Sequence, residues 1–221
     1  MKLGALIAIA RRQADDTAAP YLWSDDEWVE FANDAQVEAC RRARLITDAS
    51  TAAICQVAVT AGTSTYTLDP RIIFVRRIKL DSQTSPLRSA DHRDMDEQAP
   101  DWETQTGIPL VWIRNWETGK ARLWPTPEAN GVARLRVIRE PLVSMVSLAN
   151  DEPEIAPRYH RSLVNWMLFR AFSKKDTQTQ DDRRAAESLA LFEQEFGQKS
   201  TAVDEVWINE HHGEDSHEGL Y

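Results

Sequence analysis

Ser24-Asp25-Asp26-Glu27-Trp28 begins the stretch that decides the fold, and this stretch continues to Ile46. Ser24 and Glu27 have the spacing of a capping box, in which each side chain satisfies a backbone amide at the start of a helix. Small and apolar residues then repeat at helical spacing, which predicts one amphipathic helix. This face consists of Trp28, Phe31, Ala32, Ala35, Ala39, Ala43 and Ile46. Its alanines allow a second helix to approach closely, since interaxial distance depends on side-chain size.

A second amphipathic region, from Pro153 to Gly197, lies at the other end of the chain. One predicted helix carries Tyr159, Leu163, Trp166, Met167, Phe169 and Phe172. Its turns from Leu163 to Phe172 are apolar nearly all round, so we expect it to be the most enclosed helix. Asp181-Asp182 opens a last helix with Ala185, Leu189, Phe192 and Phe196 on one face, and Gly197 fits as its C-terminal cap.

Together with a short helix over residues 3 to 16, these segments predict a discontinuous antiparallel bundle of about four helices. We expect its two parts to be residues 1–49 and 151–200, and residues 201–221 to form an extended C-terminal arm. The predicted bundle core contains Trp28, Ala35, Ala39, Tyr159, Leu163, Trp166, Leu189 and Phe192.

Residues 50–150 have the residue pattern of β structure. Thr51 to Thr60, which includes Cys55, is rich in β-branched residues, while Arg71 to Leu80 and Val132 to Arg139 alternate in polarity. A hairpin loop at 116–120 and a short helix at 91–99 interrupt the strands. The insert therefore predicts a small antiparallel β-sandwich or open barrel, and the whole chain an α+β fold.

Composition limits the function classes. The formal net charge is −9 and the isoelectric point is near 5.1, which argues against a surface that grips nucleic-acid phosphates broadly. The only cysteines, Cys40 and Cys55, are expected to be buried thiols, and this usage fits a reducing cytoplasm. The apolar run from Leu3 to Ala10 is too short for a secretory signal, and no stretch is long enough to span a membrane.

No motif in the chain predicts catalysis. The nucleophile elbow, the P-loop and the dinucleotide-binding glycine pattern are all absent, so we predict neither an enzyme nor a cofactor. His92 and His160 are lone histidines. His211, His212 and His217 lie among carboxylates, but a terminal tail does not fix ligand geometry, so we predict no metal site there.

The C-terminal arm carries apolar residues in a polar segment. These residues are Trp207, Ile208, Leu220 and Tyr221. Such a segment can order when it docks on another protein, and we expect a contact with a neighbouring subunit. The open alternative is an unbound tail with incidental aromatics. The eight tryptophans of the chain also favour an oligomer with helical lateral faces.

Both helical blocks resemble those of tailed-phage head–tail adaptor (connector) proteins. The first likeness runs from Tyr21 to Glu27 and on through Asn33 to Gln36 and Ala39 to Ile46. The second consists of Pro153 to Tyr159, Leu163, Ala171 to Asp176 and Ala185-Ala186. The β insert resembles that of the adaptors only in its general pattern of strands and turns. It is larger than in minimal adaptors and looks like that of the embellished adaptors of short-tailed phages.

This resemblance implies a mechanical role in the virion. Adaptors of this kind form a dodecameric ring beneath the portal protein, extend C-terminal arms toward it and present a surface to the next tail or nozzle protein. DNA passes through the ring without sequence-specific binding. The protein would be made in the host cytoplasm and then be located at the tail vertex of the virion. The alternative is a binding module or assembly chaperone that uses the β insert to hold one protein partner.

Overall fold

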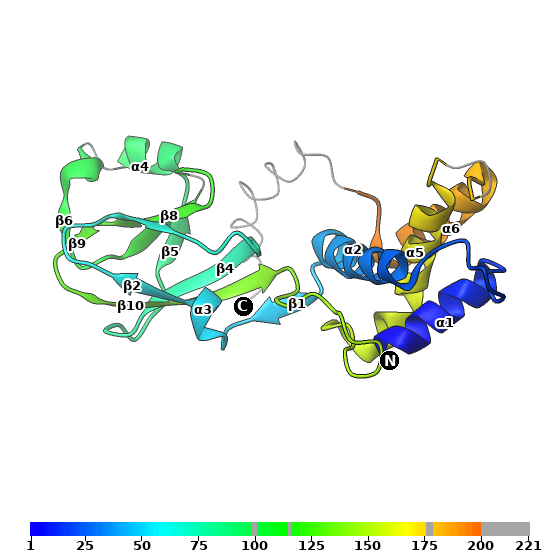
Figure 1. Cartoon of the computed structure of the whole chain (residues 1–221). Helices are drawn as coiled ribbons and strands as arrows, with labels where there is room; N and C mark the ends of the chain where they lie inside the picture. The colour runs from blue at the N-terminus through cyan, green and yellow to red at the C-terminus, as the bar shows by residue number, and fades with distance from the viewer. Residues whose placement is uncertain (99–100, 115, 176–178, 200–221) are drawn as a thin grey trace, which may run out of the picture. The chain divides into compact units, whose positions relative to one another are not determined.

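The computed structural model describes residues 1–98, 101–114, 116–175 and 179–199 (Figure 1). The chain divides into two compact units. The helical unit contains Met1–Ile46 and Glu140–Lys199, and among the described residues the β unit contains Thr47–Arg139. The fold is α+β, as the sequence predicts.

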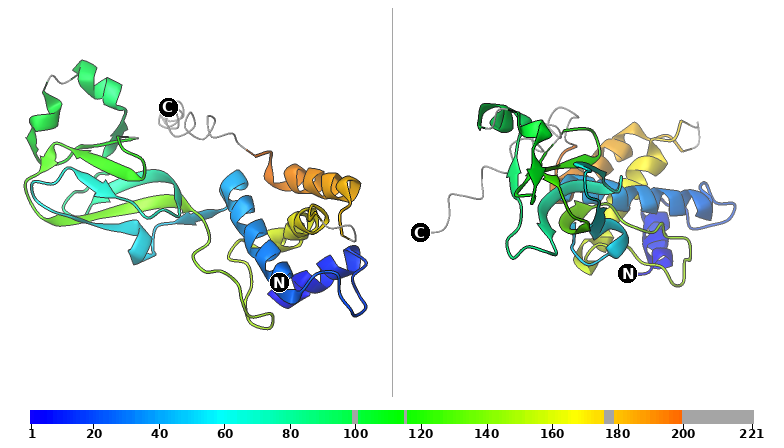
Figure 2. Two further views of the ribbon diagram at one scale, coloured as in Figure 1. Left: turned by 45° about the horizontal axis from the view of Figure 1, so that its top comes forward. Right: turned by 90° about the vertical axis from the view of Figure 1, so that its left-hand side faces the viewer.

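The helical unit is built from segments at both ends of the chain. Its elements are α1 (Leu3–Gln13), α2 (Asp25–Ala43), the 3-10 helix η2 (Pro157–Ser162), α5 (Leu163–Phe172) and α6 (Asp182–Phe196). Helix α5 packs against α1, α2 and α6, and α1 and α6 lie on opposite sides of it (Figure 2). The predicted helix through Tyr159 therefore begins as a 3-10 helix, in which Pro157 occupies the first turn and cannot donate a backbone hydrogen bond.

The predicted capping signals are present. The Ser24 side chain accepts a hydrogen bond from the Glu27 amide at 3.2 Å, and the Glu27 carboxylate accepts one from the Ser24 amide at 2.8 Å. Asp181 caps α6 by accepting from the Arg184 amide, and the amide of Gly197 donates to the Glu193 carbonyl at the other end. Local chemistry thus fixes where these two helices begin and where α6 ends.

One continuous apolar core fills the helical unit. Ala32, Ala35 and Ala39 on α2 have no exposed surface, which lets α2 lie close to α5. Trp23 and Trp28 pack with ring centroids 5.5 Å apart, and the Trp23 indole donates a hydrogen bond to the Ala171 carbonyl on α5. The core therefore joins residues that are far apart in the sequence.

The described residues of the β unit form two four-stranded sheets and one short pairing. In the first sheet β10 (Gly131–Arg139) pairs with β1 (Ile46–Asp48), β2 (Gln56–Val59) and β4 (Ile72–Leu80). The second has the order β3 (Thr65–Thr67), β8 (Lys120–Trp124), β7 (Val111–Ile113), β5 (Arg88–Ala90). Strands β6 (Thr106–Gly107) and β9 (Thr126–Pro127) form the short pairing.

The prediction of a purely antiparallel insert is wrong at two pairings. Strand β5 pairs with β7 in parallel, and β6 pairs with β9 in parallel. Parallel neighbours need a crossover connection. Helix α4 (His92–Gln98) and the 3-10 helix η1 (Trp102–Thr104) lie within the connection between β5 and β7, so a segment predicted only as a short helix sets the sheet topology.

The strand predicted over Thr51 to Thr60 is also corrected. Residues 52–55 form a single helical turn, α3 (Ala52–Cys55), and the strand begins only at Gln56. The cause lies just before it, because the Asp48 carboxylate accepts hydrogen bonds from the amides of Ser50 and Thr51 and turns the chain. Cys55 and Cys40 are buried free thiols, as predicted, and burial raises the pKa of Cys55 to about 11.

Candidate functional site: an anchored loop on the helical unit

Residues 141–156 connect β10 to η2 within the helical unit, and we call them the anchored loop. Asn33 on α2 holds its middle. The Asn33 side chain donates to the Met145 carbonyl at 2.9 Å and accepts from the Met145 amide at 2.7 Å, as a neighbouring strand would. The Met145 side chain is 3% exposed and belongs to the helical core. Both backbone and side chain of Met145 are therefore fixed.

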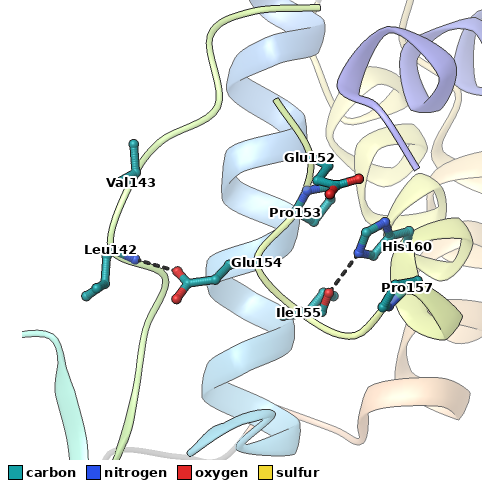
Figure 3. Close-up of a pocket in the computed structure, with 8 residues that line it drawn as sticks. All are labelled: Leu142, Val143, Glu152, Pro153, Glu154, Ile155, Pro157 and His160. Atoms are coloured by element: carbon teal, nitrogen blue, oxygen red, sulfur yellow. Dashed lines mark hydrogen bonds between the residues drawn. The ribbon is translucent and has the colours of Figure 1, made fainter. Parts of the chain in front are cut away.

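Two carboxylates inside the anchored loop fix its other turns. Asp151 accepts hydrogen bonds from the amides of Val146 and Ser147 at 2.7 and 2.8 Å, and these bonds hold its pKa below the ordinary value. Glu154 accepts one from the Leu142 amide at 2.9 Å (Figure 3). Each carboxylate replaces the hydrogen bonds that a regular strand or helix would supply.

The start of α1 supplies the third anchor. The Leu3 amide donates to the Asp151 carbonyl at 2.8 Å, and the Gly4 amide donates to the Leu148 carbonyl at 2.9 Å. These amides have no acceptor within their own helix. A Cβ atom on Gly4 would lie 2.9 Å from the Leu148 carbonyl oxygen, so this close approach requires glycine.

Apolar side chains project from this fixed backbone into solvent. Val143 is 77% exposed, Val146 is 74% exposed and Leu148 is 38% exposed, and together we call them the loop face. A backbone held by this many hydrogen bonds loses little further conformational entropy on binding. The anchored loop is therefore preorganised to contact another apolar surface.

A pocket of about 530 Å³ opens beside the loop face (Figure 3). It is lined by Leu142, Val143, Glu152, Pro153, Glu154, Ile155, Pro157 and His160. His160 is 1% exposed, and its Nε2 atom donates to the Ile155 carbonyl at 2.8 Å while its Nδ1 atom lies 2.7 Å from the amino nitrogen of Met1. With both ring nitrogens engaged, this histidine supports the turn into η2.

Metal-binding clusters and membrane-spanning helices are absent from the residues that the structure describes. In the described ranges there is no group of three or more His, Cys, Asp or Glu side chains arranged to hold a metal ion. The histidine in the pocket lies beside no serine, threonine or cysteine among the pocket's lining residues. None of the described helices is both long enough and apolar enough to cross a bilayer.

The residues predicted for the bundle core lie in the helical unit. Trp28, Ala35, Ala39, Leu163 and Phe192 have no exposed surface, and Tyr159 and Trp166 are half-buried against the same core. Leu189 is half-buried on α6. Trp28 and Trp166 thus belong to one body.

The remaining predicted site residues cannot be placed. Trp207, Ile208, Leu220 and Tyr221 lie outside the described residues, as do His211, His212 and His217. The described tryptophans are buried or half-buried in their own units, so the abundance of tryptophan no longer supports an oligomer.

Sequence reasoning missed the anchored loop. Its apolar residues at 142, 143, 145, 146 and 148 were included in the predicted β insert, residues 50–150. One available signal was Asn33, a polar residue with low helix propensity between the apolar positions Phe31, Ala32 and Ala35. Its distant partner, Met145, is not visible from local pattern.

Comparison with known proteins gives the family. No curated protein sequence matches the chain. The family model described as SU10 adaptor protein matches residues 1–211, which includes the β insert as well as both helical blocks. The match confirms the predicted resemblance to phage head–tail adaptors, and the chain belongs to the SU10 adaptor protein family.

Proposed function

We propose that this chain is a structural head–tail adaptor of a tailed bacteriophage. Copies of it form a ring, dodecameric as in the adaptors that it resembles, which joins the portal protein to the downstream tail or nozzle protein at the tail vertex. The ring leaves a passage for DNA. The family supports a virion adaptor, and the observation that carries the assembly step is the loop face, an apolar surface on a backbone fixed at several points.

The helical unit offers two different surfaces for a ring. The loop face lies at the start of α1, and exposed Ala186, Ala190 and Leu191 form a second apolar surface on α6, which we call the α6 face. Since α1 and α6 lie on opposite sides of α5, the two surfaces belong to different parts of the helical unit (Figure 2). Unlike surfaces on one subunit make head-to-tail contacts, and such contacts close into a ring when the rotation permits.

The helical unit would form the body of the ring, with residues 47–139 as an inserted domain. In this proposal Trp207, Ile208, Leu220 and Tyr221 contact the portal protein or a neighbouring copy, and repeated weak contacts gain strength through avidity. The work is mechanical, so the protein is proposed to need no catalytic group, cofactor or metal.

The test compares two pairs of exposed apolar residues. One variant carries Val143→Asp and Val146→Asp in the anchored loop. The matched control carries Ile108→Asp and Leu110→Asp in the β unit, where the side chains are 70% and 60% exposed. Since all four side chains are mostly in solvent, neither variant should lose stability beyond a few tenths of a kcal/mol. Each chain is mixed with purified portal rings and imaged by negative-stain electron microscopy.

We expect ring density beneath the portal with the unaltered chain and with the control, and no ring with the loop variant. A complete ring formed by the loop variant would exclude the loop face as a subunit contact. Single copies bound to the portal or to another partner, without closure, would favour a binding module or assembly chaperone instead.

A further inference from the structure

Cationic side chains gather on one face of the β4–β10 pair. Arg134 and Arg136 alternate along β10 with the buried Leu135 and Val137. In the antiparallel register Arg136 lies opposite Arg77, and Arg134 lies opposite Lys79. Like charges directly opposite each other destabilise a sheet, so sheet stability alone does not account for this arrangement.

An irregularity in β4 adds a further arginine. Ile78 and Leu80 are buried, so strict alternation would also bury Arg76. The register shifts between Arg136/Val137 instead, because Val137 pairs with Val75 and Arg76 is the extra residue. Val75 thereby enters the core and Arg76 stays exposed. We call this set the basic strip: Arg76, Arg77, Lys79, Arg134 and Arg136.

Most of the basic strip has no counter-charge. Arg134 makes a bidentate pair with Asp81 at 2.6 and 2.9 Å, which lowers the pKa of Asp81. Among the described residues, the side chains of the other four cations form no hydrogen bond or ion pair, although the charge of Lys79 also helps to lower the pKa of Asp81. The strip is thus an available anion-binding surface on an acidic protein.

The chain itself carries a segment of opposite charge. Residues 201–221 contain six of the 35 Asp and Glu residues and none of the 26 Lys and Arg residues, so they contribute −6 of the net charge of −9. The carboxylates are Asp204, Glu205, Glu210, Glu214, Asp215 and Glu218. We propose that, in the free chain that has not yet met the portal protein or a neighbouring copy, the basic strip is the docking surface of this acidic segment.

The same charges favour the acidic segment over DNA as the ligand of the basic strip. A protein with net charge −9 repels a phosphate backbone at long range, and Asp81 sits against one end of the strip. Firm DNA binding relies on many phosphate contacts, whereas the strip offers a small cluster on two strands. A short carboxylate-rich peptide matches its size and sign.

Carbodiimide cross-linking of the full-length chain tests the proposal, since this reagent joins carboxylates to lysine amines without a spacer. Residues 201–221 contain no lysine, and Lys79 is the only lysine of the basic strip. Mass spectrometry should find peptides of the acidic segment joined to Lys79 more than to Lys120 or Lys175. In about 1 M salt, where the Debye length is about 3 Å, this preference should disappear.

A neutralised variant provides the second measurement. Arg77→Gln with Arg136→Gln leaves Lys79 in place and relieves repulsion within the sheet, so the chain should fold. We expect the Lys79 cross-link to fall about fivefold, since exposed charge pairs are individually weak. The matched control, Arg158→Gln with Arg183→Gln, removes two exposed charges from the helical unit and should leave the cross-link unchanged.

Two results would overturn the proposal. One is an even distribution of acidic-segment cross-links over Lys2, Lys79, Lys120 and Lys175 at low salt. The other is retention of short duplex DNA by the unaltered chain but not by the Arg77/Arg136 variant, which would assign the strip to nucleic acid. Neither result depends on ring formation, so the proposed adaptor function is tested separately.

Discussion

The helical unit and the β unit are stabilised in different ways. The helical unit has a continuous core of Trp, Phe, Leu and Ala side chains, with rings such as Phe192 and Phe196 packed 4.7 Å apart. Its buried Asp16 pairs with Arg11, five positions away, whereas the buried ion pair of the β unit joins Asp48 and Arg139, 2.6 Å apart with side chains 5% and 6% exposed. Apolar periodicity is readable in a sequence, whereas a pair separated by 91 positions is not. The two units therefore differ in how far sequence predicts them.

A second buried cation sharpens this contrast. The Arg122 guanidinium lies 4.7 Å from the Trp102 ring centroid and 4.3 Å from that of Trp116. These distances are typical of cation–π contacts. The β unit thus buries two arginines, Arg122 against tryptophan rings and Arg139 against a carboxylate.

The largest effect should come from Phe192→Ala in the helical unit. Phe192 has no exposed surface and contacts the rings of Trp166 and Phe196, so its removal leaves a cavity costing about 3 to 5 kcal/mol. Hydrogen exchange should accelerate in α5 and α6 more than in β10. The control is Leu191→Ala, the neighbouring residue with 53% exposure, which should change little. Equal effects of the two substitutions would contradict the core assignment.

Asp48→Ala should destabilise the β unit by about 3 kcal/mol, since it leaves the buried Arg139 guanidinium without its carboxylate. Exchange should then accelerate in β1 and β10 while α5 stays protected. The matched control is Asp81→Ala, which breaks an exposed pair with Arg134, on the same strand as Arg139, and should change stability little. Equal losses of stability in the two variants would show that burial does not determine the contribution of the Asp48–Arg139 pair.

The same carboxylate predicts the response of the β unit to acid. Burial raises the pKa of Asp48, but hydrogen bonds from Thr51, Ser50 and Arg139 outweigh that effect and hold it well below its ordinary value. Its contribution to stability is therefore complete above about pH 5 and is lost progressively as pH falls below that value. Thermal melts should show this loss, and Asp48→Ala should remove that part of the pH dependence. If the stability of Asp48→Ala depends on pH as that of the unaltered chain does, carboxylates other than Asp48 cause the dependence.

Asn33→Ala tests the anchored loop, which is held both by hydrogen bonds from Asn33 and by the buried Met145 side chain. It leaves the amide and carbonyl of Met145 without partners, at a cost of about 1 to 3 kcal/mol. Exchange should accelerate at residues 142–148 before it does in α2. Asn150→Ala, which removes an exposed side chain from the same loop, is the control. Unchanged exchange in the loop would show that the buried Met145 side chain alone holds it.

The sequence predicted the features that depend on neighbouring residues. The α2 cap, the C-terminal cap of α6 and the strands around Arg71 to Leu80 and Val132 to Arg139 follow from local spacing. The turn at 52–55 and the parallel β5–β7 pair were missed, because their causes lie in Asp48 and in a crossover connection. The loop face was missed for the same reason, since its exposure depends on a contact between Asn33 and Met145.

The smallest effect tests whether local signals alone fix the helical unit. Ser24→Ala removes the acceptor of the Glu27 amide and should cost about 1 kcal/mol, because a capping residue satisfies an otherwise free helix amide. Exchange should increase only in the first turn of α2. Ser144→Ala, on the exposed part of the anchored loop, is the control. If Ser24→Ala leaves the first turn unchanged, the Trp23 and Trp28 contacts position α2 without the cap, and packing outweighs the local signal even in the unit that the sequence predicts best.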